Sequence, residues 1–496
     1  TAKAGKAFGT QPIVQVLDSD DNLVLNSAHT VVMTVNGYNT VGTTQKAVAS
    51  GLANFAGTGA GLSGVEGTAT LKFSLFYNGT DAAISTTQSI ALGNGDAFRF
   101  TTSTQPQATL VAGANLNALT VTVQDEWGNL VDDQTVNITP SLIDSTTGAA
   151  VTSSSKTTRS ISAGTYTFSA ANSNALTWNA AGSFKIVYSS TSLPSANQSI
   201  STNAFNIVAA SPAKLVWQTQ PSTSVVNRKV FVNTPKLVVR DAFDNDVVSD
   251  NSTVATVAVN ATGTGVVTSG ASVGLTATAV NGVISFDKLA PAAKAATGYN
   301  LTASSGSLTA PGASTSFEIT YGSASAITVS PTSLSAQAGV AFGSATTIKV
   351  VDADGNLVNV GSISATASAA SPATLTGLTA GASTLDASVS AGSATFASGS
   401  FGLGGTVGSQ KVTYAVTVNG STFYVDQAVT LSAGVASRIA VTTQPATVIA
   451  HEAFTNKVAA TVQDAYGNTV TGSTASLKAE LVNVGGSLIA GPQGEV

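Results

Sequence analysis

Apolar and polar residues alternate along many short runs of the chain. Leu119, Val121 and Val123 occupy every second position before Asp125. A period of two predicts a half-buried strand, because successive side chains of a strand point to opposite faces. Further runs of this kind include TYTF, VISF, GSFKIVYS from Gly182 and GSQKVTYAV from Gly408. The usual helix-forming residues Leu, Glu, Lys and Arg are scarce, so the pattern favours strands throughout.

A nine-residue motif, V-x-D-x-x-[G/D]-N-x-V, follows directly from five of these runs. Its first valine, aspartate, asparagine and last valine are the same in the copies that begin at Val16, Val123, Val239, Val350 and Val462. Asp and Asn side chains bond to nearby backbone, and Gly or Asn tolerates a positive φ. The motif therefore predicts a tight turn between two strands.

The motif belongs to a repeat of domain size. Its aspartates lie 107 to 116 residues apart, at Asp18, Asp125, Asp241, Asp352 and Asp464. A Gly-x-x-x-Phe element follows roughly 40 residues later, ending at Phe55, Phe168, Phe286 and Phe396. A proline-ended run precedes the aspartate by about 20 residues, at Pro106, Pro221, Pro331 and Pro445.

These spacings divide the chain into five units. We expect unit 1 to lack its opening strand and unit 5 to be truncated. The predicted boundaries are 1–95, 96–210, 211–322, 323–434 and 435–496. Since the junctions are only a few residues long, the units should form a semi-rigid rod.

About seven short strands in roughly 110 residues are typical of an immunoglobulin-like (Ig-like) β-sandwich. The predicted fold class is all-β, a tandem array of such sandwiches. The run TQP…AG…V-x-V-x-D-x-x-G-N-x-V…G-x-x-x-F…G-x-Y-x-L/V resembles bacterial Ig-like repeats. These occur in invasin- and intimin-type adhesins and in Ig-like regions of surface-layer (S-layer) proteins. The sequence shows neither a C-type-lectin-like tip nor a helical surface-layer-homology anchor.

Composition narrows the functional classes. Charged residues make up 9% of the chain, the net charge is -5, and there is no cysteine. Because the 20 basic residues are scattered singly, we expect no nucleic-acid partner. Without cysteine there is neither a disulfide nor thiol catalysis, and no apolar run reaches the ~18 residues of a membrane span. This composition fits a secreted, extracellular protein of a prokaryotic cell surface.

Two copies of the motif are calcium candidates. Asp18, Asp20 and Asn22, and likewise Asp352, Asp354 and Asn356, place oxygens at positions 1, 3 and 5 of a calcium loop. Position 12 holds His29 and Ile363 where an EF-hand has glutamate. The other three copies carry an aromatic residue at position 3, which favours a structural turn there: Trp127, Phe243 and Tyr466.

Catalytic chemistry finds no support in the sequence. The two histidines, His29 and His451, stand far apart and outside any ligand spacing. No nucleophile elbow and no distinct carboxylate pair is visible, so we predict that the chain is not an enzyme. Among the tryptophans, Trp178 is the best candidate for an exposed glycan contact, whereas Trp217 fits packing.

The leading prediction is a structural component of a self-assembling S-layer coat. Its partners would be copies of itself, with calcium as a bridging ion and cell-wall or surface glycan bound through other regions. The stalk of a large adhesin is the alternative, and a glycan-binding module that uses Trp178 is the third hypothesis.

Overall fold

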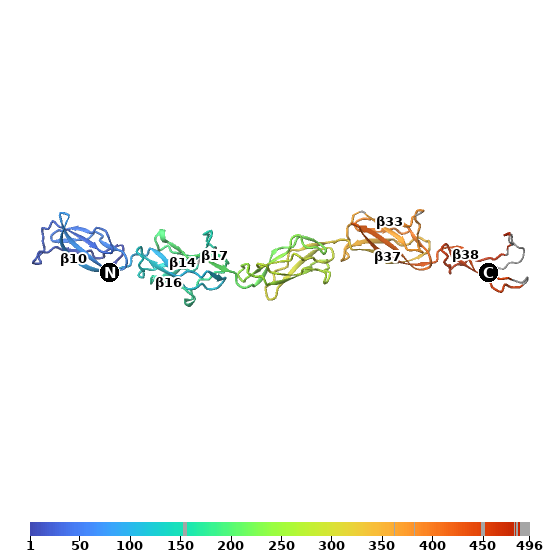
Figure 1. The fold of residues 1–496 in the computed structure, drawn as a ribbon, viewed down its shortest axis with the longest axis horizontal. Helices are drawn as coiled ribbons and strands as arrows, with labels where there is room; N and C mark the ends of the chain where they lie inside the picture. The colour runs from blue at the N-terminus through green and yellow to red at the C-terminus, as the bar shows by residue number, and fades with distance from the viewer. Residues whose placement is uncertain are drawn as a thin grey trace.

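The computed structural model describes residues 1–151, 156–361, 363–380, 382–447, 452–480, 482 and 485–486, with backbone alone for Ile363. His451 and the predicted end of unit 5 at Val496 lie outside these residues. The all-β prediction is confirmed. Two short 3-10 turns, η1 (Ala170–Asn172) and η2 (Ser195–Asn197), are the described helical segments. The units follow one another in single file (Figure 1).

Unit 2 is a sandwich of two sheets that enclose their own core. Every second side chain of β13 is buried, at Leu119, Val121 and Val123, as the alternation predicts. The smaller sheet has the order β11 (Arg99–Thr102), β13 (Leu119–Gln124) and β16 (Thr165–Phe168). The larger sheet has the order β12 (Thr109–Val111), β19 (Phe205–Val208), β17 (Gly182–Ser189), β14 (Val136–Asp144) and β15 (Arg159–Ile161), with β18 (Ser199–Ser201) beside β17.

Units 3 and 4 repeat this architecture, each with a separate core. The smaller sheet of unit 3 has β20 (Lys214–Thr219), β22 (Lys236–Arg240) and β25 (Val283–Ser285), and its larger sheet has β21 (Ser224–Val226), β27 (Phe317–Thr320), β26 (Ala296–Ser304), β23 (Val254–Ala261) and β24 (Thr276–Thr278).

In unit 4 the smaller sheet has β28 (Ala326–Ser330), β30 (Thr346–Val351) and β34 (Ser393–Phe396). The larger sheet has β29 (Ser333–Gln337), β37 (Ser421–Ser432), β36 (Gly408–Val418), β31 (Ile363–Ala369) and β33 (Thr384–Val389), and β32 (Thr374–Thr376) pairs with β35 (Gly402–Gly404).

Unit 1 differs in its smaller sheet, which holds two strands, β3 (Ile13–Gln15) and β7 (Leu52–Asn54). Its large sheet has β1 (Ala2–Lys3), β10 (Thr80–Gly93), β9 (Gly67–Tyr77), β4 (Thr30–Val35) and β6 (Gln45–Ala47), and a further sheet has β2 (Lys6–Ala7), β8 (Gly61–Ser63) and β5 (Asn39–Val41). In unit 5 the described strands are β38 (Ala436–Thr443) and β39 (Ala459–Asp464).

The Gly-x-x-x-Phe element joins the motif turn to the core. Its phenylalanine is a core side chain in units 1 to 4, at Phe55, Phe168, Phe286 and Phe396. Its glycine lies against the motif turn: Gly164 has φ +70°, and a Cβ there would stand 2.6 Å from Leu130 Cδ1. The repeated glycine is thus explained by close approach and by its backbone conformation.

Candidate functional site: an interdomain clamp

The motif forms the same tight loop in all five copies. The aspartate N–H donates to the asparagine carbonyl at 2.9–3.0 Å, and the last valine N–H donates to the first valine carbonyl at 2.8–3.0 Å. The residue three after the aspartate has a positive φ in every copy, at Asp21, Gly128, Asp244, Gly355 and Gly467. That conformation explains why the sequence has only Gly or Asp there.

One carboxylate oxygen of the aspartate holds the loop together. In unit 2, Asp125 Oδ1 accepts from the N–H groups of Trp127 at 3.0 Å and Asn129 at 2.8 Å. The equivalent pair of bonds is present at Asp18, Asp241, Asp352 and Asp464. This half of the motif is turn chemistry, as predicted.

The second oxygen reaches the short linker that enters the unit. Asp125 Oδ2 accepts from Gly95 N–H at 2.7 Å and from Asn129 Nδ2 at 2.7 Å. The three later junctions have the same linker bond at 2.7–2.8 Å, donated by Ala210, Gly322 and Gly434 to Asp241, Asp352 and Asp464.

The asparagine binds the backbone of the preceding unit from both sides of its amide. Asn129 Nδ2 donates to Gly64 O at 3.0 Å, and Glu66 N–H donates to Asn129 Oδ1 at 2.6 Å. Asn245, Asn356 and Asn468 each make the same two bonds across their own junctions. We call the motif aspartate and asparagine, with these linker and backbone partners, the interdomain clamp.

Aromatic residues at the third motif position add an apolar contact to three clamps. Trp127 packs so closely on Gly5 of unit 1 that a Cβ there would lie 2.2 Å from the indole. Phe243 covers Gly113 and Tyr466 covers Gly339 in the same way. The glycines are required because any side chain would displace the ring.

The junction between units 3 and 4 uses an ion pair instead. Arg228, also at positive φ, takes the place of that glycine, and Asp354 takes the place of the aromatic residue. Arg228 Nε and Nη2 donate to the two oxygens of Asp354 at 2.7 and 2.9 Å. Asn227 Nδ2 donates to Asp354 Oδ2 at 2.7 Å and to Asp352 Oδ2 at 2.9 Å. Both positions differ from those of the other three junctions, and together they form a matched contact.

Hydrogen bonds keep the carboxylates of Asp241, Asp352 and Asp464 ionised. Burial alone would raise the pKa of Asp464, but the bonds from Asn468, Gly434 and Tyr466 outweigh it and the pKa lies below its ordinary value. The pKa values of Asp241 and Asp352 are lowered by the same balance. At Asp354 the Arg228 guanidinium holds the pKa far below the usual range.

The geometry at Asp352–Asn356 fits calcium poorly. A guanidinium group and an amide already occupy the oxygens of Asp354, and N–H donors surround those of Asp352. Calcium needs six to eight free oxygen ligands. Across the described residues, no three His, Cys, Asp or Glu side chains are grouped so that they could hold a metal ion.

Asp18–Asn22 has the same loop, but none of the described residues makes a linker bond to it. Asp18 Oδ1 accepts from the Asp20 and Asn22 N–H groups at 2.9 and 3.0 Å. Its Oδ2 receives Asn22 Nδ2 at 3.5 Å, a long contact compared with the linker bonds elsewhere. All three side chains are exposed. Calcium at this loop stays a prediction.

The prediction of an exposed Trp178 is wrong. Its side chain is 6% exposed and belongs to the core of unit 2. Gly113 N–H donates to Trp178 O at 3.0 Å and ties this loop to the segment after β12. The indole therefore fills the core instead of lining a glycan site. Trp217 packs against the core of unit 3 and donates Nε1–H to Gly312 O at 2.8 Å.

The role of the motif in joining units was not predicted from the sequence. The signal was present in the asparagine, which is the same in all five copies although other residues also support turns. The aromatic residues at the third position were a second signal. Nothing in the sequence pointed to Arg228, because its partner Asp354 lies 126 residues away in the chain.

No protein-family model and no curated protein matches the chain. Solved structures to which it is similar include the Escherichia coli adhesin FdeC, at 16% identity over 68% of this chain and 98% of that chain, with a TM-score of 0.29. They also include Yersinia pseudotuberculosis InvD, at 13% identity over 68% and 98%, with a TM-score of 0.26. Domains 4–9 of surface layer protein SbsC match at 14% identity over 87% and 63%, with a TM-score of 0.17. At these scores the likenesses identify neither a family nor a function for the chain.

Within the part of the chain that the structure describes, there is no apolar helix of membrane-spanning length.

Proposed function

We propose that the chain is a stiff structural spacer of a prokaryotic cell surface and that it has no enzymatic role. The observation that carries this proposal is the interdomain clamp, which recurs with the same bonds at four successive junctions. A protein that needed mobile domains would gain nothing from repeating these contacts. A spacer needs each domain to hold its neighbour in one orientation.

The clamp is strong enough to bias each junction. Three bonds fix the linker and the preceding unit, one to the aspartate and two to the asparagine. At about 0.5–1.5 kcal/mol for each bond, they favour the extended arrangement by roughly 1.5–4.5 kcal/mol per junction. Bent arrangements are then fewer than roughly one in ten at each junction.

Placement at the cell surface rests on composition and on the resemblance to bacterial Ig-like repeats. The chain has no cysteine, and Lys and Arg together number 20 in 496 residues, so trypsin-like proteases have few sites. From the sequence alone, a self-assembling coat is the leading prediction. The clamp favours the adhesin-type stalk instead, because stiffness along one axis is what such a stalk requires.

Small-angle X-ray scattering tests the proposal. A compact protein of this length would have a radius of gyration of about 23 Å. The spacer should give a value well above this and the scattering profile of a rod. A chain carrying N129A, N245A, N356A and N468A together should be shorter on average. A compact wild-type chain, or a variant that is as extended as the wild type, would contradict the proposal.

A self-assembling coat is the second candidate, and strand β10 is the observation that favours it. Among the described residues, no strand pairs with the outer side of residues 84–88, and this stretch includes no charged residue. Uncharged edge strands readily pair with other chains. Negative-stain electron microscopy with calcium and then with chelator would reveal ordered sheets if this candidate holds. Isolated rods under both conditions would exclude it.

A further inference from the structure

One of the four linkers contains an Asn–Gly pair, Asn94–Gly95. At the other three junctions the residue before the linker donor is Ala209, Tyr321 or Ala433. An Asn–Gly pair is open to deamidation, because glycine has no side chain to hinder attack of its backbone nitrogen on the asparagine amide. The linker between units 1 and 2 therefore carries a reactive pair that the other linkers lack.

In the closed junction the Gly95 nitrogen is held away from this reaction. Its N–H donates to Asp125 Oδ2 at 2.7 Å. Gly95 is buried, and a Cβ on it would lie 2.9 Å from both Ala4 O of unit 1 and the Trp127 indole of unit 2. Reaction requires the nitrogen to lose its proton and to approach Asn94 Cγ. The hydrogen bond and the close packing both oppose that movement.

The Asn94 side chain is held as well. Its Nδ2 donates to Asp133 Oδ1 at 2.8 Å. The other oxygen of Asp133 pairs with Lys3 Nζ of unit 1 at 3.0 Å, so this contact also crosses the junction. Both reacting groups belong to unit 1, and carboxylates of unit 2 hold them. Opening of the junction releases both.

We propose that Asn94–Gly95 is a deamidation site whose rate is controlled by the interdomain clamp. When the junction opens, the Gly95 nitrogen bonds to Asn94 Cγ and its proton passes to water, while the Cγ–Nδ2 bond breaks and ammonia leaves. Water then opens the succinimide ring at either carbonyl, which gives aspartate or isoaspartate at position 94. The proposal depends on the clamp and not on the spacer function, so either can fail without the other.

The modified linker no longer fits the clamp. A carboxylate at position 94 faces the Asp133 carboxylate where an N–H now donates, and like charges this close repel each other. Isoaspartate also adds a carbon atom to the main chain next to Gly95, which moves its N–H away from Asp125. Deamidation therefore loosens the junction between units 1 and 2 and leaves the other three clamps unchanged.

Peptide mass spectrometry of the whole chain, kept in mildly alkaline buffer, tests the proposal. Asn129→Ala removes two hydrogen bonds that close this junction and should speed deamidation of Asn94 at least about fivefold. N356A is the matched control, because it removes the same two bonds between units 3 and 4. It should leave the Asn94 rate within about twofold of the wild type.

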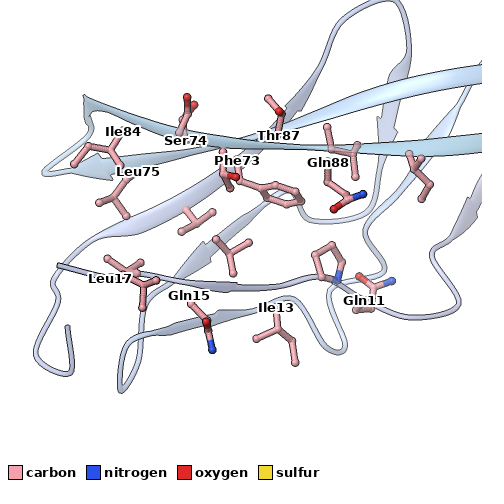
Figure 2. Close-up of a pocket in the computed structure, with 18 of the residues that line it drawn as sticks. Gln11, Ile13, Gln15, Leu17, Phe73, Ser74, Leu75, Ile84, Thr87 and Gln88 are labelled. Carbon is pink, nitrogen blue, oxygen red and sulfur yellow. The ribbon is translucent and has the colours of Figure 1, made fainter. Parts of the chain in front are cut away.

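Two other Asn–Gly pairs are internal references: Asn78–Gly79 and Asn419–Gly420. Both are exposed at hairpin turns within one unit, between β9 and β10 and between β36 and β37. Figure 2 shows β9 and β10 side by side near the first of these turns, with Leu75 on one strand and Ile84 on the other. Their deamidation should be the same in every variant, so a change confined to Asn94 reports on the junction.

Hydrogen exchange at the Glu66 amide measures the effect of the modified residue on the junction. Asn94→Asp should speed this exchange at least about fivefold, because one hydrogen bond is lost and a repulsion is gained. The double variant N94D/D133N restores a donor and an acceptor at this contact. Its exchange should return to within about twofold of the wild type.

Three results would overturn the proposal. The first is an equal rate of Asn94 deamidation in the N129A and wild-type chains. The second is an Asn94 that stays intact in N129A while the two hairpin references react. The third is unchanged exchange at Glu66 in N94D, because modification of the linker would then leave the junction closed.

Discussion

Replacing Asn129 by alanine removes both bonds by which unit 2 holds the backbone of unit 1. The lost partners are Gly64 O and Glu66 N–H, at 3.0 and 2.6 Å. Two neutral hydrogen bonds contribute roughly 1–3 kcal/mol in total. The equilibrium for opening this junction should therefore rise about 5- to 150-fold.

Hydrogen exchange at the Glu66 amide is the assay, since its proton is one of the two that the clamp holds. Asn129→Ala should speed its exchange by that factor while the core strands of unit 2 keep their protection. Asn22→Ala is the matched control: the residue has the same place in the motif but no bond to a preceding unit. Unchanged exchange at Glu66 in N129A, or an equal effect in N22A, would refute the reasoning.

Three further predictions concern pH, packing and metal. Aspartates whose pKa is lowered by folding stabilise the junctions at pH values above the ordinary aspartate pKa of about 3.9. X-ray scattering should therefore show a rod from neutral pH to about 4, and a loosened chain as the pH falls through the lowered pKa values of Asp241, Asp352 and Asp464. Loosening already at pH 6 would contradict this prediction. By calorimetry, Tyr188→Phe should leave the free energy of unfolding equal or raise it by up to about 1 kcal/mol, because the buried Tyr188 hydroxyl has no partner among the described residues. Tyr414→Phe should lower it by about 1 kcal/mol, because it removes the 2.8 Å hydrogen bond to Gln427. Because N–H donors already surround the oxygens of Asp352, chelator should leave the melting temperature of unit 4 unchanged, and a clear fall would contradict this reasoning. A fall confined to unit 1 would support calcium at Asp18–Asn22.

Local physics made most of each unit predictable. The alternation at Leu119–Val123 places β13, and the turn chemistry of the motif places the loop after it, because both depend on neighbours in sequence. The phenylalanine of Gly-x-x-x-Phe ends an alternating run of the same kind, TYTF in unit 2, and its burial follows from that local pattern.

The clamp could not be predicted in this way. Whether Asp125 Oδ2 meets a proton donor depends on where the linker places Gly95, and Asn129 needs backbone groups from 63 and 65 residues earlier. The spacing of residues in the sequence does not determine which of these distant groups form hydrogen bonds. The prediction for Trp178 was wrong for a related reason: its loop has no periodic pattern, and its burial depends on contacts with the rest of the unit 2 core.

Distance measurement across one junction tests the central claim most directly. The chain has no cysteine, so cysteines introduced at the exposed positions Thr87 in unit 1 and Asn137 in unit 2 would be the only labels. Double electron–electron resonance should give one narrow distance distribution for the clamped chain and a broader one when N129A is added. A broad distribution in the clamped chain itself would contradict the account of a stiff rod.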